Sequence, residues 1–386
     1  MMKKKMIIIS IFIIIQLIFF SGCLSGDDEV STNKSSDPPA TQTSTSTPSD
    51  LEVEDSIALD PVQLLSAPSF VWPSNKRVKD VSISNNGDYL GGLTTQKVIV
   101  QTPTENLFTN IIWINANLIS FSDSGEFFAI ADGDFVKLYD NEGYILNSYH
   151  AGGTVNRMCL LNNGTIIQGG EKTPHLSAVE SDGTQSWVWN PGSSTARVLD
   201  FDYSQNADRM PVGVNGNRFY CVSDNGKYIW YKDASGEIED VEMSDDGSRY
   251  YILTTDDIIY SFDKYGNKNW EKELNVNTVE IAIDKQGEYI LTKPGDSGAK
   301  VFLLDKHGDV EWMKTLSDVG VISISDYMEY VVISEKRELR MYDLAGNEVA
   351  SYHLDGEYGT FFVCLDMTPD VSKMVLGTTN SMLVFG

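Results

Sequence analysis

The chain is short of cysteine, histidine and basic residues, and each shortage excludes a class of protein. Only four of its 386 residues are cysteine and none forms a Cys-x-x-Cys pair, so the sequence predicts neither a disulfide scaffold nor a cysteine zinc site. The four histidines, His150, His175, His307 and His353, lack metal-ligand spacing. Hydrolase, zincin and P-loop motifs are also missing from the sequence. We therefore expect no catalytic residues and no metal site.

Positive charge is scarce as well. Lys and Arg number 29 against 55 Asp and Glu, which gives a formal net charge of −26. Nucleic acid is excluded as an expected partner, because phosphate binding relies on Lys and Arg patches. We interpret the acidity as a device for solubility, and an acidic surface of this kind can also collect divalent cations loosely without a dedicated site.

One apolar run begins the chain. Residues 6–20 are apolar apart from Ser10 and Gln16, and three lysines precede them. The run is shorter than the roughly 20 residues that span a bilayer comfortably, and the pattern is typical of a secretory signal peptide over residues 1–22. Because this segment holds three Lys and no acid, its removal leaves a charge of 26 minus 55, or −29.

The signal ends in Phe20-Ser21-Gly22-Cys23, which resembles the lipobox of bacterial and archaeal lipoproteins. The resemblance implies lipid attachment at Cys23, although Phe20 replaces the usual Leu. The alternative is an uncleaved signal anchor with an incidental cysteine. Both predict an extracytoplasmic domain anchored in the membrane at the cell surface, and the acidity with the altered lipobox favours an archaeal source.

A linker rich in Ser, Thr and Pro follows over residues 23–60. It has almost no large apolar side chains and cannot bury enough surface to offset the entropy of ordering, so we expect it to be disordered. Asn33 begins an N-glycosylation sequon here, and Asn163 begins a second one in a predicted turn. The alternative for both is an unmodified polar residue.

Residues 61–386 repeat one pattern eight times: a short apolar strand, a polar turn, two more strands, a second turn and a fourth strand. The residues at the first turn are Gly87, Gly125, Gly164, Ala207, Gly247, Gly287, Met328 and Val371. Their spacing of about 40 residues corresponds to one four-stranded antiparallel blade per repeat, and thus to an all-β, eight-bladed β-propeller. Seven blades is the alternative, if one weak repeat is miscounted.

Closure of the ring can be predicted too. The last repeat supplies only three strands before the chain stops at Gly386, and Ser69 to Trp72 has the composition of an outer strand. We expect this N-terminal segment to complete the last blade, which leaves no open edge to aggregate.

A tryptophan recurs four residues after the glycine of the second turn. It is found at Trp187, Trp230, Trp270 and Trp312. A large ring at one fixed place in each blade can cover the gap to the next blade, so we assign these residues to blade docking. The alternative is an aromatic platform for sugars or bases.

The spacing of Asp263, Gly266 and Trp270, repeated in later blades, resembles the tryptophan-docking repeats of quinoprotein-dehydrogenase-like (PQQ-like repeat) propellers. The likeness departs from that pattern by one residue fewer between Asp and Gly, and blades 2 and 7 lack the tryptophan. The enzymes of this superfamily imply a quinone beside a vicinal disulfide and Ca²⁺, but no two cysteines are adjacent here. We therefore expect no cofactor. The lipid-anchored members imply a docking platform.

Acidic residues interrupt the small side chains expected toward the axis of the ring. Asp202, Glu242 and Asp366 hold the middle position of three inner strands. Carboxylates converging on a narrow channel could bind a cation, but each could equally accept hydrogen bonds from the backbone of the next blade, and we favour this structural role.

These observations predict a monomeric, non-enzymatic binding or scaffold module for an unknown protein or cell-envelope partner. The alternative is an exported enzyme, quinoprotein-like or acting on polysaccharides, with its site at the central funnel. Fold resemblance alone does not decide between them.

Overall fold

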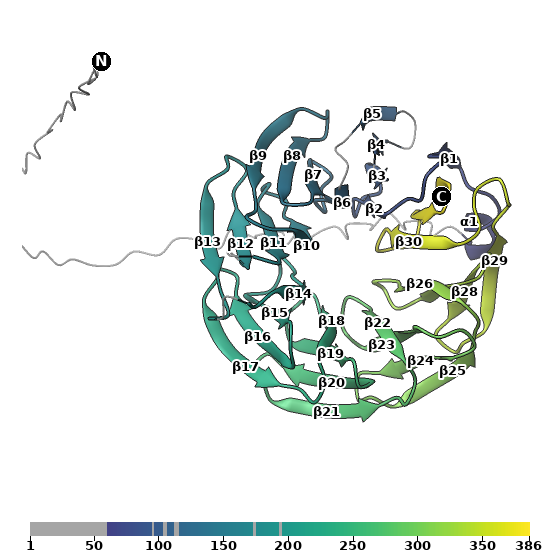
Figure 1. The fold of residues 1–386 in the computed structure, drawn as a ribbon. Helices are drawn as coiled ribbons and strands as arrows, with labels where there is room; N and C mark the ends of the chain where they lie inside the picture. Colours follow the sequence, from purple (N-terminus) through teal and green to yellow (C-terminus); the bar gives the residue numbers. More distant parts are fainter. Residues whose placement is uncertain (1–59, 95, 103–105, 112–115, 173–174, 193–194) are drawn as a thin grey trace, which may run out of the picture. The chain divides into compact units, whose positions relative to one another are not determined.

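The computed structural model describes residues 60–386 except 95, 103–105, 112–115, 173–174 and 193–194. In it, eight four-stranded antiparallel sheets follow one another around a ring (Figure 1). The predicted eight-bladed β-propeller is confirmed, and the alternative of seven blades is wrong. Cys23, Asn33 and the proposed signal and linker lie outside the described residues. Among the described helices, none has the length and apolar character to cross a membrane.

The strands of each blade run from the axis outward. Blade 1 holds β2 (Asp80–Ile83), β3 (Leu90–Leu93), β4 (Lys97–Gln101) and β5 (Asn106–Ile111); blade 2 holds β6 (Ala116–Phe121), β7 (Phe127–Asp132), β8 (Phe135–Asp140) and β9 (Ile145–His150). Blade 3 holds β10 (Val155–Leu160), β11 (Ile166–Gly170), β12 (Leu176–Val179) and β13 (Gln185–Trp189); blade 4 holds β14 (Val198–Phe201), β15 (Arg209–Val214), β16 (Arg218–Ser223) and β17 (Tyr228–Asp233). Blade 5 holds β18 (Ile238–Met243), β19 (Arg249–Thr254), β20 (Ile258–Asp263) and β21 (Lys268–Glu273); blade 6 holds β22 (Thr278–Ile283), β23 (Tyr289–Pro294), β24 (Lys300–Asp305) and β25 (Val310–Thr315). Blade 7 holds β26 (Val319–Ile324), β27 (Tyr330–Glu335), β28 (Glu338–Asp343) and β29 (Glu348–His353); blade 8 holds β30 (Phe362–Met367), β31 (Met374–Thr378), β32 (Ser381–Phe385) and β1 (Phe70–Pro73).

The N-terminal strand closes the ring as predicted. Strand β1 pairs antiparallel with β32, with Val71 opposite Leu383 and Trp72 opposite Met382. Ser69 extends this pairing, because its backbone N–H donates to the carbonyl of Val384 at 2.7 Å. The edge of the last blade is thereby covered by a segment from the start of the domain.

A short helix before β1 was not predicted. Helix α1 (Pro61–Leu64) begins after Asp60, whose side chain accepts a hydrogen bond from the backbone of Val62. Asp60 followed by Pro61 is a typical N-cap and first-turn pair, so the sequence did carry the information. Leu64 and Leu65 are buried in a cluster that includes residues of blades 7 and 8.

The packing follows the radial position of each strand. The two middle strands of a blade are almost wholly buried, as in β19 and β20, because both of their faces meet neighbouring blades. The outermost strands alternate exposed and half-buried residues, as in β21. This leaves the inner strands, which border the axis, as the place where polar groups gather inside the ring.

Candidate functional site

Aspartates on the inner strands link each blade to the next. An inner strand has a neighbouring strand on one side only, so the backbone N–H groups on its axial edge need other partners. Asp80 supplies one: its Oδ1 accepts from the N–H of Val81 at 3.0 Å, and its Oδ2 accepts from Ile119 of blade 2 at 2.9 Å. One carboxylate thus satisfies two donors on adjacent blades.

The same arrangement occurs five times, and we call these residues the carboxylate clamps. They are Asp80 to Ile119, Asp200 to Val241, Asp202 to Met243, Asp240 to Ile281 and Asp366 to Ile83, with Oδ2 accepting over 2.7 to 2.9 Å. A hydroxyl can act in the same way, since Ser82 Oγ accepts from the N–H of Phe121 at 3.1 Å. Sequence reasoning missed Asp80, Asp200 and Asp240, which lie two residues before the position it considered.

The three residues considered for a channel cation do not come together. Asp202 and Glu242 line the same cavity, whereas Asp366 lies outside its lining and binds the backbone of blade 1. Within residues 60–386 as described, no group of three or more His, Cys, Asp or Glu side chains is placed to hold a metal ion. Asp202 and Asp366 each accept two backbone hydrogen bonds, which is the alternative considered for them.

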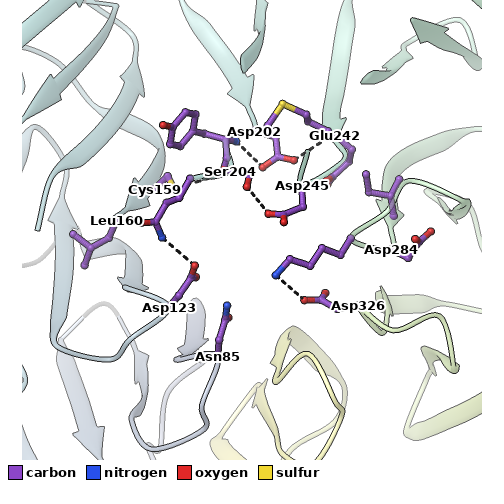
Figure 2. A pocket seen from close by; sticks show the side chains of 15 residues that line it. Asn85, Asp123, Cys159, Leu160, Asp202, Ser204, Glu242, Asp245, Asp284 and Asp326 are labelled. Atoms are coloured by element: carbon purple, nitrogen blue, oxygen red, sulfur yellow. Dashed lines mark hydrogen bonds and ion pairs between the residues drawn. The ribbon is translucent and has the colours of Figure 1, made fainter. Parts of the chain in front are cut away.

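The cavity lies where the inner strands end, and its volume is about 260 Å³ (Figure 2). Seven blades contribute to it. Its lining comprises Asn85, Asp123, Cys159, Leu160, Asp202, Tyr203, Ser204, Gln205, Glu242, Met243, Asp245, Ile283, Asp284, Lys285 and Asp326. Strand residues such as Glu242 are set within the ring, and turn residues such as Asp123 form the mouth.

The lining is strongly acidic. Six carboxylates face one cation, Lys285, whose Nζ is 3.8 Å from Asp326. Two further carboxylates at the mouth have polar partners: Asp123 accepts from Gln205 at 3.0 Å, and Asp245 accepts from Ser204. The cavity therefore presents net negative charge, and its field favours cationic groups.

Burial raises the pKa of the axial carboxyls. It raises the pKa of Asp80 and of Asp202 to about 6, and that of Asp366 to about 7, against the backbone hydrogen bonds that favour the ionised form. The pKa values of Asp240 and Glu242 are also raised well above the ordinary range, first by burial and then by neighbouring carboxylates.

Arg157 on β10 partly offsets this charge. Its Nε donates to Asp200, and its guanidinium is 3.6 Å from Asp240. The charge of Asp200 is the main reason that the pKa of Arg157 is raised. Arg157 therefore connects blade 3 with blades 4 and 5 inside the channel, a role that the sequence pattern did not indicate.

The four predicted docking tryptophans lie on glycines of the following blade. A Cβ added at Gly226, Gly266, Gly308 or Gly346 would lie 2.5 to 3.1 Å from the ring of Trp187, Trp230, Trp270 or Trp312, respectively. The indoles of Trp230, Trp270 and Trp312 also donate to carbonyls of the next blade, at 3.2, 2.7 and 3.1 Å. In blade 2, Asn147 takes the same place against Gly183.

The remaining predicted residues lie apart from the cavity, with one exception. Cys159 lines it as a free thiol, and burial raises its pKa to about 12, which keeps it protonated. Cys221 and Cys364 are also free. Asn163 is exposed in its turn, where its side chain accepts from the N–H of Thr165, a buried residue.

The ring and its acidic axial cavity define the class: the domain is an eight-bladed β-propeller with a negatively charged funnel. A family model described as a family of unknown function, DUF5711, matches residues 248–382, which span blades 5 to 8. Among proteins of curated function no match was found.

Solved propellers resemble the whole ring. The structure of the Dos1 propeller aligns with a TM-score of 0.70 at 10% identity, covering 85% of this chain and 96% of that one. The β-propeller domain of Cps50 (Swd1) from Myceliophteria thermophila aligns with a TM-score of 0.56 at 16% identity, covering 69% of this chain and 95% of that one. At these identities the likeness shows the fold alone.

Proposed function

We propose that the chain is a non-enzymatic binding module, tethered at the extracytoplasmic surface through Cys23, that holds a protein or cell-envelope partner at the mouth of its funnel. The observation that carries the proposal is the cavity of about 260 Å³, whose lining has six carboxylates and one lysine. A rigid, charged and concave surface assembled from seven blades suits recognition of a partner.

The site's chemistry supports binding rather than turnover. Most carboxylates at the axis already accept backbone or side-chain hydrogen bonds, as Asp202 and Asp245 do, and these bonds hold them in place. Cys159 is a protonated thiol at neutral pH because its pKa is about 12. These groups stabilise the ring and shape its field.

We further propose that the domain belongs with the quinoprotein-like propellers, as a lipid-anchored docking platform. The support is the contact between each docking tryptophan and the turn glycine of the next blade, shown by Trp270 and Gly308. This contact has the spacing on which the resemblance rests.

Site-specific photo-crosslinking on intact cells tests the binding function. Tyr327 is 60% exposed in a turn beside Asp326 at the funnel mouth, and Phe361 is 52% exposed between β29 and β30 at the other ends of the strands. A benzoylphenylalanine at position 327 is expected to capture a partner, and the same residue at position 361 is the control. Equal yields at the two positions, or none at 327, would contradict the proposal. A cofactor absorbance in the purified protein, or turnover of a sugar or alcohol, would favour the enzyme alternative.

The tether is tested separately. Replacement of Cys23 by alanine is expected to move the protein from the membrane fraction to the soluble fraction. Retention of the Cys23→Ala variant in the membrane fraction would instead indicate an uncleaved signal anchor.

A further inference from the structure

Glu242 departs from the rule that the axial carboxylates follow. It occupies the inner-strand position that Asp202 and Asp366 hold in blades 4 and 8, from which each reaches the N–H of the next blade. The corresponding N–H in blade 6 belongs to Ile283, and no bond joins it to Glu242 in the described residues. Glutamate is one methylene longer than aspartate, and here its carboxylate lines the cavity instead of clamping the adjacent blade (Figure 2).

The surroundings of Glu242 are unfavourable for an unpaired charge. Protein atoms enclose the side chain except where it borders the cavity, and in the described part of the chain its carboxylate has no hydrogen bond or ion pair. Asp202, Asp240 and Asp200 add their repulsion, while Arg157 offers the attraction of one cation that is already engaged by Asp200 and Asp240. A buried carboxylate without a partner is costly, and a cation entering the cavity would remove that cost.

The geometry points to an alkyl-ammonium group as the ligand of this site, bound by Glu242 and accompanied by Asp202 and Asp245. This inference rests on the proposed binding function and names the chemistry of the partner. It also goes beyond loose attraction to an acidic surface, because it assigns recognition to one side chain.

Three features of the cavity select this ligand class. Its volume of about 260 Å³ is far larger than a bare metal ion needs, and no metal-holding group of side chains was found in the described residues. Leu160, Met243 and Ile283 give the wall apolar surface beside the carboxylates, which suits the methylene stem of an amine. The carboxylates come from different blades, and an ammonium is a compact charge that donates in three directions, whereas a guanidinium prefers one planar fork.

The ammonium can come from a lysine side chain of a partner or from a free polyamine. Isothermal titration at about 0.15 M salt, where long-range surface attraction is screened, tests both with two probes: the peptide acetyl-Gly-Lys-Gly-amide and spermidine. Binding of the peptide alone assigns the site to a lysine side chain, and binding of spermidine alone assigns it to a polyamine. We expect the binding probe to lose about tenfold or more in affinity in Glu242→Gln.

Two variants separate the site from general acidity. Glu329 is an exposed residue of a blade 7 turn outside the cavity lining, so Glu329→Gln makes the same charge change elsewhere on the ring and should keep the affinity of the original chain. Glu242→Asp keeps the charge but shortens the side chain to clamp length. It should bind as weakly as Glu242→Gln, while the free energy of unfolding rises because Ile283 N–H gains an acceptor.

The inference is overturned if neither probe binds, if Glu242→Gln and Glu329→Gln lose affinity equally, or if acetyl-Gly-Arg-Gly-amide binds more tightly than the lysine peptide. Crosslinking from position 327 in the Glu242→Gln background distinguishes this failure from failure of the binding function. A partner captured as efficiently as before would leave the binding function standing and remove Glu242 from it. Probe binding that depends on Glu242, without any captured partner, would do the reverse.

Discussion

Asp366 and Ile83 are 283 residues apart in the chain, yet Oδ2 of Asp366 accepts a hydrogen bond from the backbone N–H of Ile83 at 2.9 Å. The bond joins the inner strand of the last blade to that of the first. Together with the pairing of β1 and β32, it closes the ring from the inside as well as from the outside.

Removal of this closing clamp should destabilise the ring. In Asp366→Ala, the N–H groups of Ile83 and Met367 lose their acceptor, which we expect to lower the free energy of unfolding by about 1–3 kcal/mol. Asp366→Asn keeps one amide oxygen as an acceptor and should lose less. Urea denaturation measures both variants, and an equal loss in the two would show that hydrogen bonding to the carboxylate oxygens is not the cause.

Stability should fall as the pH rises from about 4 to about 7. Burial raises the pKa of Asp80 and Asp202 to about 6 and that of Asp366 to about 7, so the folded protein holds these protons more tightly than the unfolded chain does. The stabilisation from the bound protons is complete below the unfolded pKa near 3.8 and is lost as the pH passes the folded values. Each carboxyl should contribute a loss of about 2 kcal/mol.

Denaturant midpoints measured across this pH range check that profile. The triple variant Asp80→Asn, Asp202→Asn, Asp366→Asn should show a flatter dependence. Turn residues such as Asp263 and Asp343 have lowered pKa values and act oppositely, but only as the pH falls below about 4. A steady rise in stability from pH 4.5 to pH 7.5 would contradict the assignment.

The docking tryptophans offer a matched comparison. Trp270 Nε1 donates to the carbonyl of Lys306 at 2.7 Å, whereas no hydrogen bond from Trp187 Nε1 is found in the described structure. Both rings lie on a turn glycine, so tryptophan to phenylalanine removes similar packing from each. We expect Trp270→Phe to cost about 1 kcal/mol more than Trp187→Phe in thermal or urea unfolding. Equal losses would assign the docking to ring packing alone.

Met328 adopts a left-handed backbone conformation with φ of 57°, at a turn position that is glycine in five of the blades. A side chain in this region is strained by roughly 1–2 kcal/mol. Met328→Gly should therefore raise the free energy of unfolding by about 1 kcal/mol, after loss of the half-buried side chain is counted. Gly287→Ala, at the equivalent turn with φ of 65°, is the converse control and should lower it. A loss of stability in Met328→Gly would show that its packing outweighs the strain.

The repeat with its period near 40 residues determined the number of blades, and the missing fourth strand of the last repeat determined where the ring closes. The docking tryptophans could be placed from sequence for the same reason. Strand alternation, turn glycines and recurring spacing are local properties of the chain, and they recur in every blade. Even α1, which the analysis missed, is written locally in Asp60 and Pro61.

The clamps and the cavity depended on the tertiary structure. Asp202 and Met243 are 41 residues apart, and whether the carboxylate meets that N–H depends on how far one blade is rotated and shifted against the next. The sequence placed Asp202 and Glu242 at the same inner-strand position, yet the structure gives them different surroundings, because one extra methylene takes the carboxylate of Glu242 away from the backbone and into the cavity. Distances between blades decide such outcomes, and no pattern within one repeat encodes them.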